Sequence, residues 1–329
     1  MELAAAEREM LTELQKGIPI EARPFSGYSM PEADVVALLV RAQHSGLVRR
    51  FGGVFDSHRL GYKSMLCAVK VQEFALAQTA ATICKHPGVT HCYERRAITG
   101  AHTYPLLWFT IAMPEDAFDA GMERLQSQMP AEKILALPAL QRFKIDVVFD
   151  LRHAGADGGT ASSSFGRQGD DLESVLLTEQ ERRLVRLLGG DFAVAEQPFC
   201  EMAEQIEMAV PDLLDTLRRW KELGVLRRIA PVLYHRVAGF TANGMCVWPV
   251  SGDVGTFGQQ VAARPAVTHC YQRTRVPEFP FDLYAMIHAG STEALHGMFG
   301  EITASCGLQG GILLRSGQVF KKSSMQYFA

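Results

Sequence analysis

Hydrophobic residues recur with the period of an α-helix at two places, one in each half of the chain. The first helix face is formed by Val35, Leu38, Leu39 and Ala42, and the second by Leu213, Leu214, Leu217 and Trp220. Pro31 and Pro211 stand at the helix starts, where a missing backbone N–H costs nothing. Each helix runs into a Gly-x-x-Arg-Arg segment. This order predicts a winged-helix head in each half.

Strand and helix patterns alternate after the first head. Strands are predicted at 62–71, 89–93, 107–113 and 143–149, and helices at 73–86 and along the stripe Phe118, Met122, Leu125 and Met129. The order is βαββαβ, which is typical of a ferredoxin-like sandwich, and the second half repeats it. The predicted fold class is therefore α+β, with two tandem copies of a winged helix-turn-helix head plus a ferredoxin-like βαββαβ sandwich.

The two halves share a repeat with a constant offset of 178 positions. PGVTHCYERR (87–96) matches PAVTHCYQRT (265–274), and SGLVRRFGGV (45–54) matches LGVLRRIAPV (223–232). The offset places His58 opposite Arg236 and His235 opposite Ser57, so the halves diverge at this point. The divergence predicts one full site, or two sites with different duties, rather than two identical sites.

A stretch rich in Gly, Ser and Asp separates the copies and is predicted to be a flexible linker. We predict a first half at 1–152 (head 1–60, sandwich 61–152), a linker at 153–172 and a second half at 173–329 (head 173–238, sandwich 239–329). Four-stranded sheets of this kind leave an open face or edge, so we expect the halves to pack together.

Composition narrows the function classes. The 329 residues are 47% hydrophobic and 21% charged, with a formal net charge of −3, which argues mildly against a duplex-binding protein. The chain lacks an apolar run long enough for a membrane span, and its start does not resemble a signal peptide. Seven cysteines without a C-x-x-C pair argue against zinc, iron–sulfur and disulfide frameworks, so we expect a cytoplasmic protein. Nucleotide, flavin and zinc-hydrolase motifs are also missing.

The head-plus-sandwich order resembles the Lrp/AsnC group of bacterial regulators. A closer resemblance is to the siroheme decarboxylases, an enzymatic branch of that group in which the halves are separate subunits or fused. It is carried by GLVRRFGGVFDSHRLGY, GVTHCYERR and LLWFTIAMP in the first half, and by GVLRRIAPVLYHRVAGF, NGMCVWPV, VTHCYQR, FPFDLYAMIHA and VFKKSSMQYF in the second. The resemblance implies removal of two acetate carboxyl groups from siroheme, giving 12,18-didecarboxysiroheme for heme d1 or an alternative route to heme.

The implied substrate carries eight carboxylates on a flat apolar macrocycle and brings its own iron, so we expect no other cofactor. Arginine suits the carboxylates because its planar fork binds them in a bidentate manner. The candidate substrate-binding arginines are Arg49, Arg50, Arg95, Arg227, Arg228 and Arg273. Solvated positions or surface ion pairs are the competing interpretation. Lys321 and Lys322 offer additional charge, with a solvated strand end as the alternative.

Loss of carbon dioxide from an acetate leaves a carbanion that needs a proton, and histidine is the best general acid near neutral pH. His91 and His269, at equivalent positions of the repeat, are the first candidates. Each is equally suited to be an axial ligand of the substrate iron. His102 and His288 are further candidates for substrate binding. Hydrogen-bonding or packing roles are the structural alternatives for all four.

The neighbours of these histidines have less specific predictions. Tyr93 and Tyr271 are suited to donate to a carboxylate, although packing is the commoner role of a strand tyrosine. Cys92 and Cys270 are expected to be small core residues.

Two other functions use the same residues. An Lrp/AsnC-type DNA-binding regulator needs a cationic recognition helix, and 211–223, with Arg218, Arg219 and Lys221, is a better one than 31–45. A non-catalytic heme-binding sensor needs the same arginines and histidines. We expect siroheme as the binding partner, with neither nucleic acid nor membrane. The internal pair of halves is either complete alone or forms a homodimer.

Overall fold

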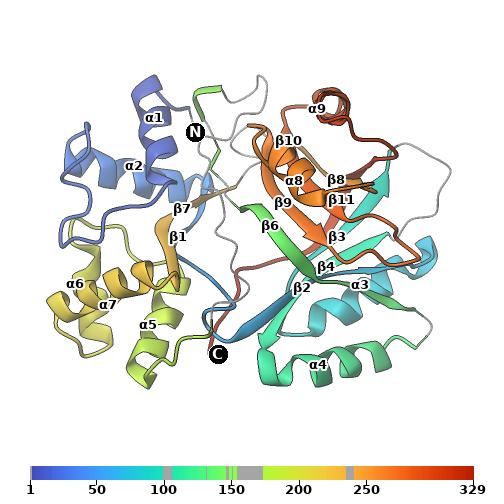
Figure 1. The fold of residues 1–329 in the computed structure, drawn as a ribbon. Coiled ribbons are helices and arrows are strands. Elements are labelled where there is room, and N and C mark those ends of the chain that lie inside the picture. The colour runs from blue at the N-terminus through green and yellow to red at the C-terminus, as the bar shows by residue number, and fades with distance from the viewer. Residues whose placement is uncertain are drawn as a thin grey trace.

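A computed structural model of the chain describes residues 2–98, 106–130, 132–145, 148–149, 151–153, 173–234 and 241–329. These residues form two bodies that lie side by side (Figure 1). One body holds the helical heads of both halves, and the other holds the strands and helices of both sandwiches. In the described residues no helix is long and apolar enough to cross a membrane.

The head body contains five helices and two strands in its described part. The first half supplies α1 (Ala5–Leu14), α2 (Glu32–His44) and β1 (Val48–Phe55), and the second supplies α5 (Glu179–Gly189), α6 (Pro198–Gln205), α7 (Val210–Glu222) and β7 (Leu226–Leu233). Thr178 begins α5 with a capping box, in which its hydroxyl accepts from the N–H of Glu181 and the Glu181 carboxylate accepts from the N–H of Thr178. The predicted apolar stripes of α2 and α7 are confirmed, since all eight residues are buried.

The two heads are not separate units. Strands β1 and β7, which carry the duplicated Arg-Arg pairs, form an antiparallel two-stranded sheet with each other. One hydrophobic core runs through both heads and includes Phe51, Phe199 and Trp220. Burial of these side chains therefore ties the first head to the second.

The sandwich body follows the predicted βαββαβ order in the second half, and in the first half it follows that order with one additional strand. The first half supplies β2 (Tyr62–Val69), a 3-10 turn (Glu73–Ala75), α3 (Leu76–Lys85), β3 (Val89–Ala97), β4 (Leu107–Pro114), α4 (Glu115–Ser127), β5 (Ile134–Leu137), β6 (Ala139–Ile145) and a second 3-10 turn (Leu151–His153). The second half supplies β8 (Ala242–Trp248), α8 (Val254–Ala262), β9 (Val267–Arg273), β10 (Leu283–Ala289), α9 (Thr292–Ser305) and β11 (Ile312–Lys322).

The strands of both halves join in one nine-stranded sheet with the order β5-β2-β4-β3-β11-β8-β10-β9-β6. Strand β11 lies between β8 of its own half and β3 of the other half. Strand β6 leaves its own half and pairs with β9 of the second. The expected packing of the halves is therefore confirmed, and it is achieved by exchange of strands.

The last strand of the first half differs from the prediction. A strand was predicted at 143–149, whereas the strand that pairs with β9 is Ala139–Ile145. Pro138 separates it from the short strand Ile134–Leu137, which pairs with β2 instead. The predicted strand overlaps the observed one at 143–145, and 146–147 lie outside the described residues. The prediction missed the start of the strand at Ala139, because pairing with β9 of the other half decides which residues enter the sheet. The predicted linker lies almost entirely outside the described residues, and the division into halves stays a prediction.

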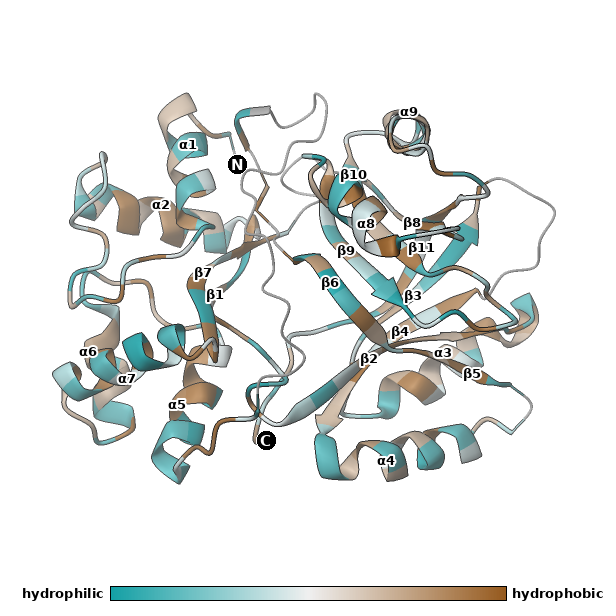
Figure 2. Cartoon of the chain, viewed as in Figure 1, coloured by the Kyte–Doolittle hydropathy of each residue, from teal (hydrophilic) through white to brown (hydrophobic). Residues whose placement is uncertain are grey.

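The sheet bends so that its two halves face each other, with α3 and α4 outside one and α8 and α9 outside the other (Figure 1). Trp108, Phe279, Tyr284 and Leu314 belong to the apolar cluster between the two half-sheets. Figure 2 shows hydrophobic residues along β4 and hydrophilic residues at the ends of β3 and β9. The repeated Thr-His-Cys-Tyr motif therefore places polar side chains on β3 and β9, strands that also contribute buried residues to the hydrophobic core.

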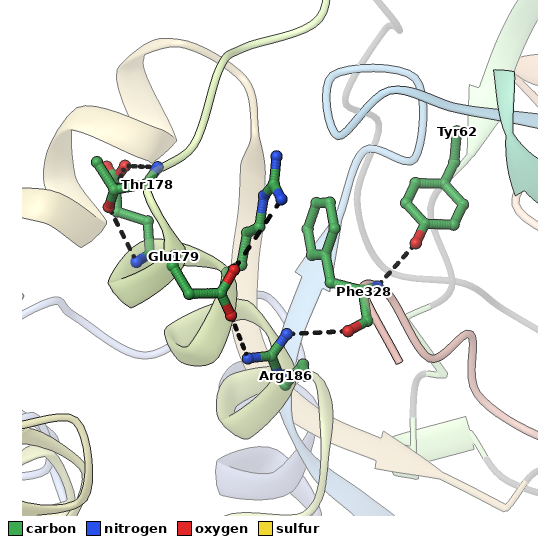
Figure 3. Close-up of polar contacts among 7 residues, drawn as sticks. Tyr62, Thr178, Glu179, Arg186 and Phe328 are labelled. Carbon is green, nitrogen blue, oxygen red and sulfur yellow. Dashed lines mark hydrogen bonds and ion pairs between the residues drawn. The ribbon is translucent and has the colours of Figure 1, made fainter. Parts of the chain in front are cut away.

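The C-terminal residues connect the two bodies. After β11 the chain returns to the heads, where the N–H of Phe328 donates to the Tyr62 hydroxyl (2.7 Å) and Arg186 donates to the Phe328 carbonyl (2.9 Å; Figure 3). Arg186 also donates to Glu179, on the same helix α5 (Figure 3). Tyr327 packs edge-on against Tyr62, with ring centroids 5.1 Å apart. The end of the second half is thus anchored to helix α5 of the second head and to the start of strand β2 in the sheet.

Candidate site between the heads and the sheet

The two candidate proton donors lie on equivalent strands, His91 on β3 and His269 on β9. Cys92 and Cys270, one residue further along, are fully buried in the clusters beneath the helices, as expected for small core residues. Successive strand residues point to opposite faces, so both histidines lie on the face away from the helices. Half-buried histidines on this face can meet a bound molecule.

A threonine orients each imidazole. The Nδ1 atom of His91 lies 2.9 Å from the Thr90 hydroxyl, and that of His269 lies 3.0 Å from the Thr268 hydroxyl. The Thr268 hydroxyl also lies 3.3 Å from the Met286 carbonyl, which is an acceptor for its proton. When Nδ1 of His269 carries the proton and donates to this hydroxyl, the neutral ring has its lone pair at Nε2, as a metal ligand requires.

His91 lies in a positive environment. Burial lowers its pKa to about 4, with additional lowering by the charges of Arg49, Lys322 and His269. Arg49 comes from the head strand β1, Lys322 is the register partner of His91 on β11, and His269 comes from the other half. The two duplicated histidines therefore share one electrostatic environment, and His91 is neutral at pH 7 without a bound anion.

On one side of the histidines lies a group that we name the Arg49 side: Arg49, Tyr93, Tyr234 and Lys322. The ammonium of Lys322 lies 5.2 Å from the centroid of the Tyr234 ring. Burial raises the pKa of Tyr93, and the charges of Arg95 and Arg49 oppose this rise. In the described part of the chain Arg49 makes neither a hydrogen bond nor an ion pair. Its guanidinium has all its donors available for an anion.

The corresponding group, the Arg227 side, contains Arg227, Asp56, Arg142 and Tyr271. The Asp56 carboxylate lies 2.5 Å from Arg227 and 3.4 Å from Arg142, and it accepts the His58 N–H at 3.0 Å. Burial alone would raise the pKa of Asp56, but the charges of Arg227 and Arg142 outweigh it, and the pKa lies below its usual value. Asp56 is therefore ionised and bridges strands β7 and β6.

Arg95 and Arg273 cross between the half-sheets. Arg95 donates to Ser316 (3.0 Å) and reaches the sulfur of Met286, and burial lowers its pKa to about 10. Arg273 donates to the Leu137 carbonyl (2.7 Å) and lies over the Tyr271 ring. Among the described residues neither guanidinium has a carboxylate partner, and the Nε atom of each has no hydrogen-bond acceptor. Such buried cations attract an anionic ligand.

The structure does not bring all the predicted residues to this place. Arg50 donates to the carbonyls of Gly189 and Gly53, and the side chain of Arg228 lies beside Gly17. Their substrate contacts stay predictions, and for Arg50 the contact with the end of α5 is a competing role. The Lys321 ammonium donates to the carbonyls of Cys84 and His86 at the C-terminal end of α3.

The two remaining histidines have different outcomes. His288 reaches the same threonine as His269, with Nδ1 3.4 Å from the Thr268 hydroxyl, and its ring packs edge-on against Phe149. His102 lies outside the described residues.

Three residues of the site escaped the sequence analysis: Asp56, Arg142 and Tyr234. Asp56 and Tyr234 occupy equivalent positions at the offset of 178, so the repeat alignment held the signal. Arg142 comes from the exchanged strand β6, and nothing local in the sequence indicates its destination.

Metal-ligand groups and two clefts were compared with the histidine site. Within the described ranges no group of three His, Cys, Asp or Glu side chains is arranged to hold a metal ion. Two clefts of about 360 and 440 Å³ lie on the heads, one beside Tyr28 and Lys221 and the other beside Phe192 and Met202. Neither cleft includes a histidine.

Two of the three cations of the candidate recognition helix pair with carboxylates. Arg218 pairs with Asp215 at 2.8 Å, and Arg219 pairs with Glu181 of the neighbouring helix α5. The α2 helix shows the same feature, because its Arg41 pairs with Glu7. These cations are therefore occupied, which disfavours contact with phosphates.

Comparisons with known proteins support the duplicated architecture. An AsnC-like ligand binding domain matches residues 59–144 and 237–321, and a siroheme decarboxylase NirDL-like HTH domain matches residues 181–227. The siroheme decarboxylase of Hydrogenobacter thermophilus is 34% identical over 328 residues, with 98% of this chain and 94% of the relative covered. A siroheme decarboxylase beta subunit of Methanosarcina barkeri is 32% identical over 145 residues, covering 44% of this chain and 95% of the subunit.

Solved structures give the same result. The crystal structure of the siroheme decarboxylase NirDL has a TM-score of 0.73 and 30% identity, covering 98% of this chain and 94% of that one. NirDL in complex with an iron-uroporphyrin III analogue has a TM-score of 0.71 and 29% identity, covering 99% and 95%. The protein of that complex therefore shares both its sequence family and its overall fold with this chain.

Proposed function

We propose that this chain, which belongs to the siroheme decarboxylase family, is a carboxy-lyase that converts siroheme to 12,18-didecarboxysiroheme on a route to heme d1 or heme. The observation that carries the proposal is that His91 lies within electrostatic reach of both its duplicate His269 and Arg49, a cation with no carboxylate partner in the described residues. The family relationship names the substrate class, and these residues have the chemistry to hold it.

The reaction needs an anion site and a proton. The bond between the acetate methylene and its carboxyl carbon breaks, carbon dioxide leaves, and the electron pair stays on the methylene, in conjugation with the macrocycle. A proton from His91 or His269 then converts the methylene to a methyl group. Each carbon dioxide released therefore consumes one proton, and no external oxidant or reductant enters the balance.

Binding of the anionic substrate favours the protonated form of His91. Burial and the neighbouring cations keep His91 neutral, but carboxylates bound at Arg49 and Lys322 offset those cations and raise the pKa of His91. Arg95 and Arg273 add attraction from between the half-sheets. Protonation of the donor is thereby coupled to substrate binding.

The substrate's iron is the only metal in this scheme, and we propose no other cofactor. Nε2 of His91 or His269 is suited to be its axial ligand, and the other histidine then supplies the proton.

The test is anaerobic incubation of the purified protein with siroheme, followed by mass spectrometry of the tetrapyrrole. We expect loss of two carboxyl groups in the wild type and at least a hundredfold slower loss in His91→Ala or His269→Ala. His44→Ala, at an exposed position of α2, is the matched control. Siroheme that binds unchanged would identify a carrier or sensor. Salt-dependent retention on duplex DNA without siroheme binding would identify a regulator, against the proposal.

A further inference from the structure

The two sides of the site differ at one pair of equivalent positions. The offset of 178 aligns Arg49 with Arg227 and Tyr93 with Tyr271, so these residues are duplicated. The same offset aligns Asp56 with Tyr234. One arginine of the duplicated pair therefore has a carboxylate nearby, and the other has a phenol.

On the Arg227 side an internal carboxylate already occupies the cations. Asp56 contacts Arg227 at 2.5 Å and Arg142 at 3.4 Å, and the His58 N–H holds its other oxygen at 3.0 Å. Asp56 follows β1, Arg227 lies on β7 and Arg142 on β6, so the carboxylate joins both heads to the sheet. A second carboxylate at this position would have to share these two guanidinium groups with Asp56 and would lie beside its like charge.

On the Arg49 side no carboxylate of the described chain takes the corresponding place. Arg49 makes neither a hydrogen bond nor an ion pair there, and the Tyr234 ring lies against the Lys322 ammonium instead of delivering an anion. His91 is the histidine whose strand partner is Lys322. Arg49, Lys322 and the candidate proton donor His91 therefore surround one position that suits an acetate.

We infer that the acetate to be decarboxylated is held on the Arg49 side, beside His91, and that Asp56 closes the Arg227 side to a substrate carboxylate. The inference deepens the proposed function and depends on it. Because only one side accepts a carboxylate, the two acetates are processed one after the other at the same place.

The first experiment compares two neutral replacements. Arg49→Gln removes a cation that has no carboxylate partner in the described residues, whereas the double variant Asp56→Asn/Arg227→Gln removes one anion and one cation of the Arg227 side together and leaves Arg142 in place. We expect Arg49→Gln to lower kcat/KM for siroheme at least a hundredfold, and the double variant to lower it less than tenfold. Equal losses, or a larger loss in the double variant, would overturn the inference.

The second experiment introduces on the Arg49 side the carboxylate that Asp56 supplies on the Arg227 side. Tyr234→Asp places a carboxylate on the Arg49 side, and Tyr234→Phe is the matched control. We expect Tyr234→Asp to weaken binding of an iron-uroporphyrin III probe and to lower decarboxylation at least tenfold relative to Tyr234→Phe. Equal behaviour of the two variants, both folded by circular dichroism, would refute the assignment.

The wild type separates the inference from the proposed function. If wild-type protein leaves siroheme unchanged, the proposed function fails. If the wild type is active while Arg49→Gln is as active as the double variant, only the assignment to the Arg49 side fails.

Discussion

Replacement of His91 by asparagine should reduce the acid sensitivity of the folded protein. The pKa of His91 is lowered from 6.5 to about 4 by burial, Arg49, Lys322 and His269. Between these values the unfolded chain binds a proton that the folded protein does not. The contribution of His91 to stability is therefore fully present above pH 6.5 and is lost as the pH falls towards 4.

The magnitude follows from the two pKa values. Going from about pH 7.5 to about pH 5 favours the unfolded state by about 2 kcal/mol through this one histidine. Urea unfolding of the wild type and His91→Asn at both pH values measures this contribution. The change in free energy of unfolding between the two pH values is determined for each protein, and the two changes are then subtracted. Asparagine keeps a polar group near the Thr90 hydroxyl, and His86, whose pKa burial also lowers, contributes equally to both proteins.

Between about pH 7.5 and about pH 5 the free energy of unfolding should fall in both proteins. The fall should be about 2 kcal/mol smaller in His91→Asn than in the wild type. His44→Asn, at an exposed position, should behave as the wild type does. An identical pH dependence in the wild type and His91→Asn would refute the reasoning, because it would mean that His91 is not held neutral by its surroundings.

Three further predictions concern the frame of the site. Gly258→Ala places a Cβ 2.2 Å from the Phe143 ring of the exchanged strand and should cost about 1–3 kcal/mol in urea unfolding, whereas Gly297→Ala, with open space around it, should not destabilise. Thr178→Ala removes the cap of α5 and should cost about 1 kcal/mol, with Thr178→Ser close to wild type. Phe328→Ala should lower the thermal midpoint by weakening the contact with Tyr62, at a cost of about 1–2 kcal/mol, whereas Phe328→Tyr should lower it less. An unchanged midpoint in Phe328→Ala would show that the C-terminal anchor adds no stability.

The sequence was most informative where local periodicity decides the structure. The stripes of α2 and α7 and the βαββαβ order appear in the structure as predicted, because helix faces and strand alternation depend on near neighbours in the chain. The constant offset of the repeat also predicted that the two histidines occupy equivalent strands. Local pattern and duplication therefore accounted for most of the fold.

Contacts between the halves were beyond local pattern. The pairing of β6 with β9 depends on a partner more than a hundred residues away, and it alone brings Arg142 to Asp56. Likewise, Arg50 looked equivalent to Arg49 in sequence, although strand alternation turns it to the carbonyls of α5. The sequence showed which side chains are charged, but it did not show which residue each charged side chain contacts.

Strand exchange has a consequence for stoichiometry. Strand β6 completes the sheet edge of the second half, and β11 fills the space between β8 and β3, so a half expressed alone would leave unpaired edges. If the two halves were separate chains, each would have to bind the other half rather than a second copy of itself. A pair of identical halves would place two Asp56 residues, or two Tyr234 residues, on opposite sides of the site. Fusion in one chain supplies each half with its proper partner at high effective concentration, at any level of expression. One gene therefore guarantees that every molecule holds one Asp56 and one Tyr234 in opposed positions.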